Sequence, residues 1–355
     1  PVRLDGLKNS YFSRMSALHH KTWLPRVSLT LLPSTRIAMP SEPSAKLRRK
    51  KAGEGMRGIM QHMLFAARSP QTLWQAYLST MNSQGRGAPL MEDVKAPNYS
   101  YGQMATMALA LGRMSARHSR EGEAIGLLLP NLAATVAMLL GVGAHRRIPA
   151  MLNYSAGPEG VAAACHAAQI NTVITSRAFI EQAKLEPLIA GLSQQRVLYL
   201  EDLRAEFGWA DKLWLISLAR WLPHRALPSH ANPEEAAVIL FTSGSEGKPK
   251  GVVLSHRALL ANVAQIQSLF DLTTADKILN VLPVFHAFGL TGGVLLPMLT
   301  GAQVFLHVSP LHYKLVPEIA YDRNCTMLFG TSTFLANYGK FAHPYDFHKL
   351  RYVIA

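Results

Sequence analysis

The residues from Thr242 to Gly251 have side chains and a spacing that suit the binding of a polyphosphate. The segment follows an apolar run, Ala237 to Leu240, that predicts a buried strand. Glycines let the backbone come close to a ligand, and successive backbone N–H groups form an anion-binding nest. Hydroxyls and lysines add hydrogen-bond donors and positive charge. We therefore expect a phosphate-binding loop here, and an ordinary glycine-rich turn between two strands is the alternative.

This loop is not a Walker A loop, because Lys248 is followed by Pro249 rather than by serine or threonine. Its acidic residue is unusual, since the carboxylate of Glu246 repels phosphate unless it points away. The residues that we expect to bind phosphate are Thr242, Ser243, Gly244, Ser245, Glu246, Gly247, Lys248, Lys250 and Gly251.

Two further clusters that could do chemistry follow predicted strands. His286 lies between aromatic residues after the strand predicted over 278–281, and Gly330 and Thr331 follow the strand predicted over 326–329. Ligands of open α/β sheets collect beyond the carboxyl ends of the strands, so we expect these clusters to converge with the loop. The alternatives are a core histidine satisfied by hydrogen bonds and a plain helix N-cap at Thr331.

The elements that position these residues alternate between strand and helix from about residue 67 onward. This alternation predicts an α/β domain with layered, largely parallel sheets. After the loop, Val252–Leu254 is expected to close a hairpin, and Ser255 is expected to cap the next helix. The other main predictions are helices over 71–81, 100–118, 132–142, 160–168 and 315–322 and strands over 125–129, 172–175, 197–200, 304–308 and 350–355.

Composition excludes several classes of protein. The chain has 355 residues, of which 49% are hydrophobic and 16% charged, so a large core is available. Its two cysteines, Cys165 and Cys325, lie far apart, which argues against a disulfide framework and a cysteine-based zinc site. We predict no protein-held metal site from the pattern of residues.

The net charge of +14 is concentrated at the start of the chain. Residues 1–66 carry twelve Lys or Arg against three Asp or Glu, a net charge of +9. Within them, Ser44 precedes a basic helix that continues into an apolar stripe from Met56 to Leu64. The basic residues of this helix either form a solvated turn at the start of a packed helix or form a cationic face that binds anionic lipid. Nucleic-acid binding is not expected, because aromatic residues do not alternate with the basic ones.

No segment is predicted to cross a membrane as a clean helix. The most apolar stretch, residues 124–144, is interrupted by Pro130 and Asn131 and fits a strand, a turn and a helix better. A second apolar stretch, residues 288–305, contains four glycines and a proline and is interpreted as a helix followed by a strand.

The order and content of these clusters resemble the adenylate-forming superfamily of acyl-CoA synthetases, luciferases and nonribosomal adenylation domains. Thr242–Gly251 matches its T-S-G-[ST]-x-G-x-P-K-G signature, although most members have threonine where this chain has Glu246. Phe285–Gly289 resembles its aromatic-His-x-x-Gly motif. Gly330–Thr333 resembles its Gly-x-Pro-Thr segment with serine in place of proline, and the segment ending at Tyr154 loosely resembles an early one that ends in Asn-Pro.

A narrower group within this superfamily is also similar. Residues 309–313, 329–335 and 344–347 look like the bacterial bifunctional acyl-acyl-carrier-protein synthetases/2-acylglycerophosphoethanolamine acyltransferases. The resemblance implies that residues 1–66 are the C-terminal tail of an acyltransferase-like α/β domain. Residues 67–355 are then the N-terminal part of a truncated AMP-binding, adenylating domain. We expect a fragment of a longer protein, because the sequence begins without an initiator methionine and ends within a predicted strand. None of the fourteen histidines has aspartate five residues later, as the acyltransferase motif His-x-x-x-x-Asp requires, so the resemblance implies an acyltransferase centre before Pro1.

The resemblance implies an activity with defined partners. ATP and Mg²⁺ activate a long-chain fatty acid as its acyl-adenylate, which passes to the thiol of acyl-carrier protein and then to a lysophospholipid at the membrane surface. The loop residues hold the phosphates, His286 is the catalytic residue near the carboxylate, and Gly330 and Thr331 line the acyl pocket. The implied location is the cytoplasmic face of the bacterial inner membrane. A fatty acid–CoA ligase and a non-catalytic, membrane-surface nucleotide-binding module are the alternatives.

Overall fold

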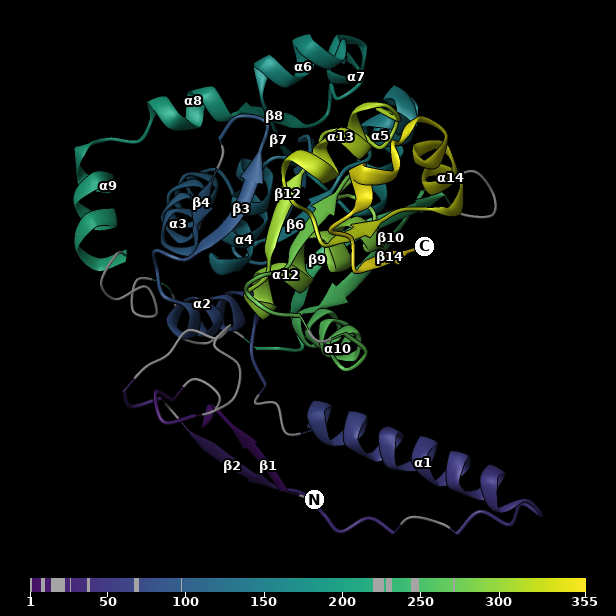
Figure 1. The fold of residues 1–355 in the computed structure, drawn as a ribbon. Helices are drawn as coiled ribbons and strands as arrows, with labels where there is room; N and C mark the ends of the chain where they lie inside the picture. Colours follow the sequence, from purple (N-terminus) through teal and green to yellow (C-terminus); the bar gives the residue numbers. More distant parts are fainter. Residues whose placement is uncertain are drawn as a thin grey trace.

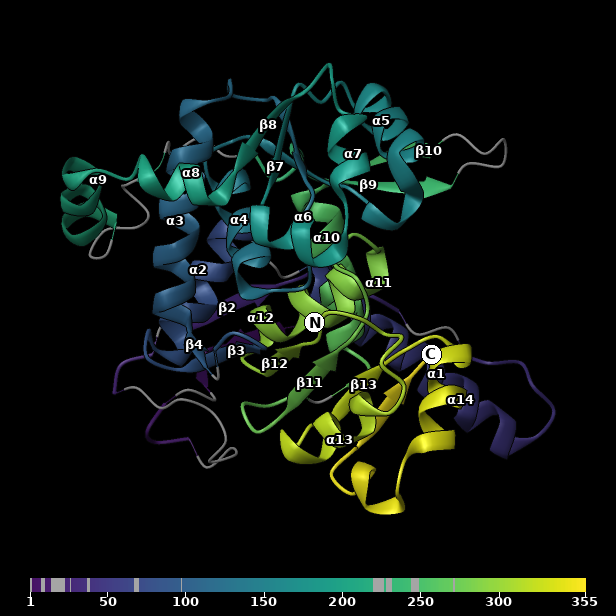
Figure 2. The ribbon, with the colours of Figure 1, turned by 90° about the horizontal axis from the view of Figure 1, so that it is seen from above.

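Two six-stranded β-sheets organise the chain, and helices fill the space between them and cover their outer faces (Figures 1 and 2). The computed structural model describes residues 2–7, 10–13, 23–25, 27–36, 39–66, 70–96, 98–219, 227, 232–243, 249–270 and 272–355.

The first sheet carries the predicted phosphate loop. Its strands, in spatial order, are β10 (Pro249–Ser255), β9 (Ala236–Ser243), β6 (Ile148–Met151), β5 (Ala124–Leu127), β7 (Thr172–Thr175) and β8 (Arg196–Tyr199). The neighbouring strands from β9 to β8 are parallel, and β10 is antiparallel to β9. The carboxyl ends of β9, β6, β5, β7 and β8 therefore lie along one edge of this sheet.

The second sheet carries the other predicted clusters. Its strands, in spatial order, are β14 (Tyr352–Ile354), β13 (Met327–Phe329), β11 (Lys277–Asn280), β12 (Gln303–Leu306), β3 (Pro89–Asp93) and β4 (Tyr99–Ser100). Pairing is parallel from β14 to β3, and β4 is antiparallel to β3.

The helices form layers around these sheets (Figure 2). Helices of the main body that begin before residue 210 are α2 (Leu73–Gln84), α3 (Tyr101–Arg117), α4 (Ala133–Ala144), α5 (Gly157–Ala167), α6 (Arg177–Ala183), α7 (Glu186–Ala190), α8 (Leu200–Ala205) and α9 (Trp209–Trp214). Those that follow are α10 (His256–Gln267), α11 (Ala287–Leu290), α12 (Leu296–Thr300), α13 (Leu315–Asp322) and α14 (Ser332–Phe341). Short 3₁₀ turns lie at Tyr154–Ala156 and Pro344–Phe347, and π-helical turns lie at Leu215–Ala219 and Thr291–Leu295.

Helix α4 joins the two sheets. Its sequence is apolar almost all round, as expected of a helix buried on all sides, and it contacts β5 and β6 of one sheet and β3 of the other. Leu132 provides no side-chain cap at its start. Instead, the backbone N–H of Ala133 donates to the carboxylate of Asp93, the last residue of β3, over 2.9 Å. A negative charge at this helix end also complements the helix dipole.

The outer face of the first sheet has a core of its own. Val161 and Cys165 of α5 pack there with Val173 of β7 and Ile239 of β9. Side chains alternate between the faces of a strand. Leu240 accordingly packs into the larger core between the two sheets, which places Thr242 on that inner side as well.

The described part of residues 1–66 lies beside this body (Figure 1). Strands β1 (Val2–Asp5) and β2 (Ser28–Leu31) form an antiparallel pair, and helix α1 (Ala45–Ala66) contacts α10. Leucine and methionine side chains of α1 are exposed, with 48% of Met56 and 53% of Met60 accessible to solvent.

The predicted α/β fold with layered, largely parallel sheets is confirmed. Strand β7 and helix α13 have the predicted bounds, and Ser255 accepts a hydrogen bond from the N–H of Ala258 as the predicted cap of α10. Residues 124–144 and 288–305 contain strands as well as helices. In the described part of the chain, no helix is both long enough and apolar enough to span a membrane.

Candidate functional site

The predicted phosphate loop connects β9 and β10 as a hairpin. Thr242 pairs with Lys250 across the two strands, and Phe241 pairs with Gly251. Thr242 and Lys250 are both exposed at the loop end of the hairpin. Paired residues of antiparallel strands point to the same face, so the hydroxyl and the ammonium are presented together on the inner side of the sheet.

The structure describes little of the rest of this loop. Gly244, Ser245, Glu246, Gly247 and Lys248 lie outside the described residues, and Ser243 is described only through its backbone pairing with Pro249. Their assignment as phosphate ligands stays a prediction. At Gly251, a Cβ atom would lie 3.3 Å from the side chain of Ile239, so the glycine permits tight packing of the hairpin.

His286 follows β11 at the start of α11, where its backbone is extended and its side chain makes no capping hydrogen bond. His286 is exposed, so it is not a buried core histidine. Partial burial lowers the pKa of His286 below its usual value, which favours the neutral ring near pH 7.

Aromatic contacts connect His286 to the first sheet. The ring of Phe285 lies 4.6 Å from that of His286 and 5.0 Å from that of Tyr154, measured between centroids. Tyr154 in turn contacts Phe179 of α6, with centroids 5.2 Å apart. Tyr154 follows β6, which is the parallel neighbour of β9. The histidine is thereby brought to the same sheet edge from which the loop after β9 leaves.

Gly330 and Thr331 follow β13, the parallel neighbour of β11, and so share a sheet edge with His286. The rings of Phe288 and Phe329, with centroids 5.3 Å apart, join the two segments. Thr331 is the N-cap of α14, and its hydroxyl accepts a hydrogen bond from the N–H of Phe334. The plain capping role that the sequence left open is therefore present, and a role in an acyl pocket stays a prediction.

Asn131 fixes the segment that leads to His286, and its role was not predicted from the sequence. Its side chain is 1% exposed and lies in the turn between β5 and α4. The side-chain carbonyl accepts a hydrogen bond from the N–H of Val284 over 2.9 Å. The amide group donates to the carbonyls of Leu282 over 2.8 Å and of His307 over 3.1 Å. One side chain of the first sheet's edge thus clamps two loops of the second sheet.

Asn280 supports the same segment from β11. Its side-chain carbonyl accepts from the N–H of Leu282, and its amide donates to the carbonyl of Gly289. Gly293 lies so close that a Cβ there would overlap the amide group of Asn280. The π-helical turn at this point, which widens the helix by one residue, leaves room for the buried asparagine.

This arrangement agrees with a known family. The model of the AMP-binding enzyme family matches residues 79–355, which is most of the chain. The chain belongs to the AMP-binding enzyme family. The match includes the hairpin, His286 and Gly330, so all three clusters lie within the AMP-binding region.

Curated relatives and solved structures agree with this membership. The chain is 28% identical over 219 residues to a sulfoacetate–CoA ligase from Cupriavidus necator, a match that covers 61% of this chain and 40% of the relative. It is 35% identical over 111 residues to a medium-chain fatty-acid–CoA ligase from Escherichia coli, which covers 31% of this chain and 19% of the relative. The matched part is thus less than half of either relative's length.

The fold of this AMP-binding enzyme is also similar to that of o-succinylbenzoate CoA synthetase from Bacillus subtilis in complex with an acyl-adenylate. The TM-score is 0.66 at 17% identity, and the superposition covers 80% of this chain and 68% of the other. This similarity confirms the predicted adenylate-forming architecture.

The described residues of this AMP-binding enzyme contain no group of three or more His, Cys, Asp or Glu side chains that could by itself hold a metal ion. Mg²⁺ is commonly held by one or two carboxylates together with the phosphates of a nucleotide.

A cavity of about 780 Å³ lies next to the aromatic contacts and is lined by Tyr154, Phe179 and Phe285. Its wall also contains a pair of histidines that sequence analysis missed, although their spacing of five residues is visible in the sequence. Nε2 of His307 and Nδ1 of His312 are 2.9 Å apart. Burial, with His312 nearby, lowers the pKa of His307 to about 4, so this ring is neutral at pH 7.

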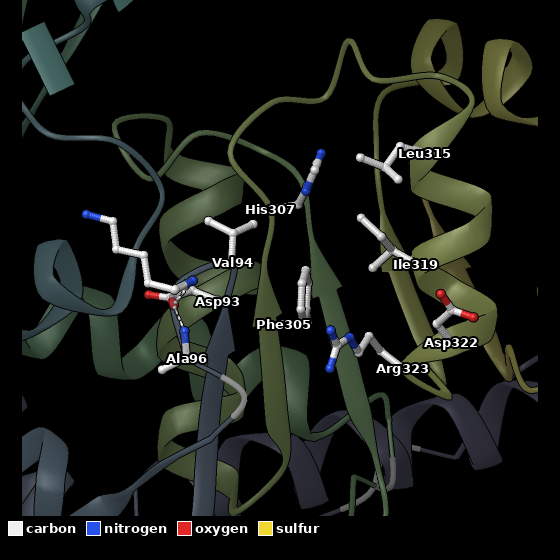
Figure 3. A pocket seen from close by; sticks show the side chains of 10 residues that line it. Asp93, Val94, Ala96, Phe305, His307, Leu315, Ile319, Asp322 and Arg323 are labelled. Carbon is white, nitrogen blue, oxygen red and sulfur yellow. Dashed lines mark hydrogen bonds between the residues drawn. The ribbon is translucent and has the colours of Figure 1, made fainter. Parts of the chain in front are cut away.

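A smaller pocket of about 370 Å³ adjoins this cavity (Figure 3). The two share Val94, Lys95, His307 and Leu315 in their walls. Figure 3 shows His307 between Val94 on the loop after β3 and Leu315 on α13. That loop is held by Asp93, whose carboxylate accepts hydrogen bonds from the N–H groups of the second and third residues after it.

Proposed function

We propose that the chain is the nucleotide-binding part of an enzyme that activates a long-chain fatty acid with ATP. The observation that carries this proposal is the exposed Thr242–Lys250 pair at the open end of the β9–β10 hairpin. A cation and a hydroxyl on one face of a glycine-rich hairpin suit the β- and γ-phosphates. Membership of the AMP-binding enzyme family and the fatty-acid ligase among the relatives support the same activity.

The chemistry follows from the weakness of a carboxylate as an electrophile. A carboxylate oxygen attacks the α-phosphorus of ATP, the bond to the β-phosphate oxygen breaks, and pyrophosphate leaves. The acyl carbon now carries AMP as a good leaving group, and a thiolate displaces it. Mg²⁺, when bound with ATP, offsets the negative charge of the phosphates.

The residues of the chain reduce the repulsion between carboxylate and triphosphate. Lys250 and the hairpin's backbone N–H groups hold the leaving pyrophosphate electrostatically. His286, which is neutral because burial lowers its pKa, is free to donate a hydrogen bond to the carboxylate or the α-phosphate. Asn131 and Asn280 fix the loop that presents it.

We further propose that the acceptor is the phosphopantetheine thiol of acyl-carrier protein, and that the acyl group then passes to lysophospholipid. Support comes from the sequence similarity to bifunctional synthetase/acyltransferases and from the basic residues 1–66, taken as the tail of an acyltransferase domain. Thioester formation by the full-length protein tests the acceptor. Product with acyl-carrier protein and little with coenzyme A is expected, and the reverse preference would make the protein an acyl-CoA ligase.

Helix α1 supports a location at the cytoplasmic face of the bacterial inner membrane. Lys46, Arg49 and Lys50 are exposed on it, as are Met56 and Met60 further along. Each such cation contributes about 1 kcal/mol of attraction near an anionic bilayer. Full-length protein is expected to float with phosphatidylglycerol vesicles and to lose this binding when the three cations are changed to glutamine. Equal flotation of the variant would contradict the proposal.

ATP–pyrophosphate exchange on the full-length protein tests the activity itself. Exchange that depends on a long-chain fatty acid is expected, and no exchange with any carboxylic acid would exclude the proposed function. Lys250→Ala should lose one charge-assisted contact, about 1.5–3 kcal/mol, or roughly tenfold to a hundredfold in exchange rate at limiting ATP. Lys212→Ala, which removes an exposed lysine of α9, is the matched control and should not change the rate.

A further inference from the structure

A strip of exposed apolar side chains lies where α13 and α14 meet the loop after β3. It consists of Val94, Leu311, Leu315 and Phe341, each between 43% and 60% exposed. Leu315 joins the two halves of the strip, because it lines the pocket of about 370 Å³ with Val94 and an open groove of about 470 Å³ with Leu311 and Phe341. Figure 3 shows Val94 and Leu315 on either side of His307. Exposed apolar side chains are usually scattered singly, so a contiguous strip points to an interaction site.

Hydrogen bonds hold this strip in place. The hydroxyl of Tyr338, a residue of α14 that is 1% exposed, donates to the carbonyl of Pro310 over 2.8 Å. The N–H of Leu311 donates to the hydroxyl of Ser309 over 3.2 Å. At the other end of the strip, Asp93 accepts hydrogen bonds from the backbone of the loop after β3. The apolar side chains are therefore presented by a preformed surface.

Lysines border the strip, and Lys95, Lys314 and Lys340 are all exposed. The ammonium of Lys314 lies 5.6 Å from the centroid of the Phe341 ring, and that of Lys340 donates to the side-chain carbonyl of Asn337. Neither of these contacts neutralises the positive charge. The described lining of the groove contains no carboxylate.

The balance of exposed charge around the strip is positive. Further along α13, the exposed carboxylates of Glu318 and Asp322 are followed by the exposed Arg323. With the three lysines, four cations thus stand against two carboxylates, a net charge of +2. An anionic partner is therefore favoured over a cationic one.

The elements that carry the strip lie on the same side of the molecule as α1. Figure 2 shows α1, α13 and α14 along one side, whereas α9 lies on the far side. Helix α1 presents exposed cations and methionines of its own. A planar partner that contacts α1 can therefore reach the strip too.

The side-chain types suit a bilayer better than a protein. Protein interfaces are depleted in lysine and depend on arginine and large aromatic anchors that a complementary surface buries completely. At a bilayer, leucine and phenylalanine side chains enter the boundary between headgroups and acyl chains, while long lysine side chains extend to the lipid phosphates. The strip and its border have this second combination, and their net charge complements an anionic bilayer.

We propose that the strip and its lysines form a second contact with an anionic bilayer, on the body of this AMP-binding enzyme and separate from α1. This inference deepens the proposed membrane location and rests on it for the presence of a bilayer. Two linked contacts bind more tightly than either one, so the loss of one weakens binding even when the other is intact. Two contacts also fix the orientation of the body on the membrane.

Two substitutions weaken this contact without reaching the core. Phe341→Ser removes an exposed ring in the last turn of α14, and Lys314→Gln removes an exposed charge. Leu213→Ser and Lys212→Gln, at exposed positions of α9 on the far side, are the matched controls. All four variants should keep the thermal melt of the unchanged protein and its rate of ATP–pyrophosphate exchange without vesicles.

Titration of the full-length protein with phosphatidylglycerol vesicles measures the contact. Phe341→Ser should weaken binding about fivefold at low and high salt, because a half-exposed ring is no longer buried in lipid. Lys314→Gln should weaken binding about fivefold at low salt, and its effect should vanish at high salt. Both controls should bind as the unchanged protein does. As a direct readout, brominated lipids should quench the tryptophan fluorescence of Phe341→Trp more strongly than that of the unchanged protein.

Three results would overturn the inference. One is unchanged vesicle binding by Phe341→Ser and Lys314→Gln together with no added quenching in Phe341→Trp. Another is equal weakening by the two α9 controls, which would show adsorption through any exposed side chain. The third is a higher KM for acyl-carrier protein with unchanged vesicle binding, which would assign the strip to an acidic protein.

The failure of this inference is distinguishable from that of the proposed function. Loss of vesicle binding when the three cations of α1 are changed, with no effect of the strip variants, would support the contact at α1 and exclude the strip. ATP–pyrophosphate exchange without vesicles tests the activity independently of either contact.

Discussion

The clamp at Asn131 predicts that this one asparagine controls both stability and activity. Asn131→Ala removes three hydrogen bonds at a site that is 1% exposed, and leaves the N–H of Val284 and two carbonyls without partners. A hydrogen bond contributes about 1 kcal/mol net, and a buried unsatisfied group costs about 1–3 kcal/mol. We therefore expect the free energy of unfolding to fall by about 3 kcal/mol or more.

Asn131→Asp separates the polar contacts from the packing. The carboxylate keeps the shape and can still accept from Val284, but it faces the carbonyls of Leu282 and His307 without a proton to donate. This variant should be at least as unstable as Asn131→Ala at pH 8. It should recover stability as the pH falls, because a protonated carboxyl regains one donor.

Urea unfolding of the full-length protein at several pH values measures both effects, and ATP–pyrophosphate exchange measures the effect on His286. Exchange should fall in both variants even at temperatures where they remain folded. Asn337→Ala, which removes two exposed hydrogen bonds on α14, is the control. If both Asn131 variants stay within about 0.5 kcal/mol of the unchanged protein at every pH, the clamp does not hold the loops together.

Two other predictions concern buried groups. Gly293→Ala should cost about 1–3 kcal/mol of stability because its Cβ would overlap Asn280. Gly143→Ala, in the last turn of α4 where a Cβ meets no neighbouring atom, should instead gain up to about 1 kcal/mol. Equal effects of the two substitutions in thermal melts would contradict this. Nδ1 of His256 accepts the N–H of Leu73 over 3.2 Å, and burial lowers the pKa of His256 to about 4. Because the pKa of His256 is lower in the folded than in the unfolded chain, its contribution to the free energy of unfolding should be fully present above about pH 6.5. This contribution should be lost as the pH falls toward 4, at a cost of up to roughly 3 kcal/mol. The free energy of unfolding of His256→Gln should therefore decline less steeply over this pH range. An unchanged slope in that variant would contradict the assignment.

Local patterns predicted much of the fold. Strand β7 (Thr172–Thr175) is an apolar and β-branched run of the right length, and α13 (Leu315–Asp322) has a helical apolar period, so both were predicted with correct bounds. The hairpin was recognised because its turn residues are consecutive in sequence. Strand β3 (Pro89–Asp93) was missed, because it begins with proline, ends in two acidic residues and owes its place to pairing with β12.

The site was less predictable where it depends on contacts between the sheets. Asn131 was interpreted only as part of a turn, because nothing in the sequence shows that its amide reaches Leu282 and His307. The aromatic contacts from Tyr154 to His286 likewise join segments more than a hundred residues apart. The cavity arises from loops of both sheets, and no single stretch of sequence encodes it.

Hydrogen exchange of the full-length protein with and without ATP is the most direct test of the account's central claim, which is that the β9–β10 hairpin holds the nucleotide's phosphates. The account predicts that ATP slows exchange of the backbone N–H groups from about residue 242 to 251, and that Lys250→Ala weakens this protection. Protection that lies elsewhere in the chain, or none at saturating ATP, would contradict it.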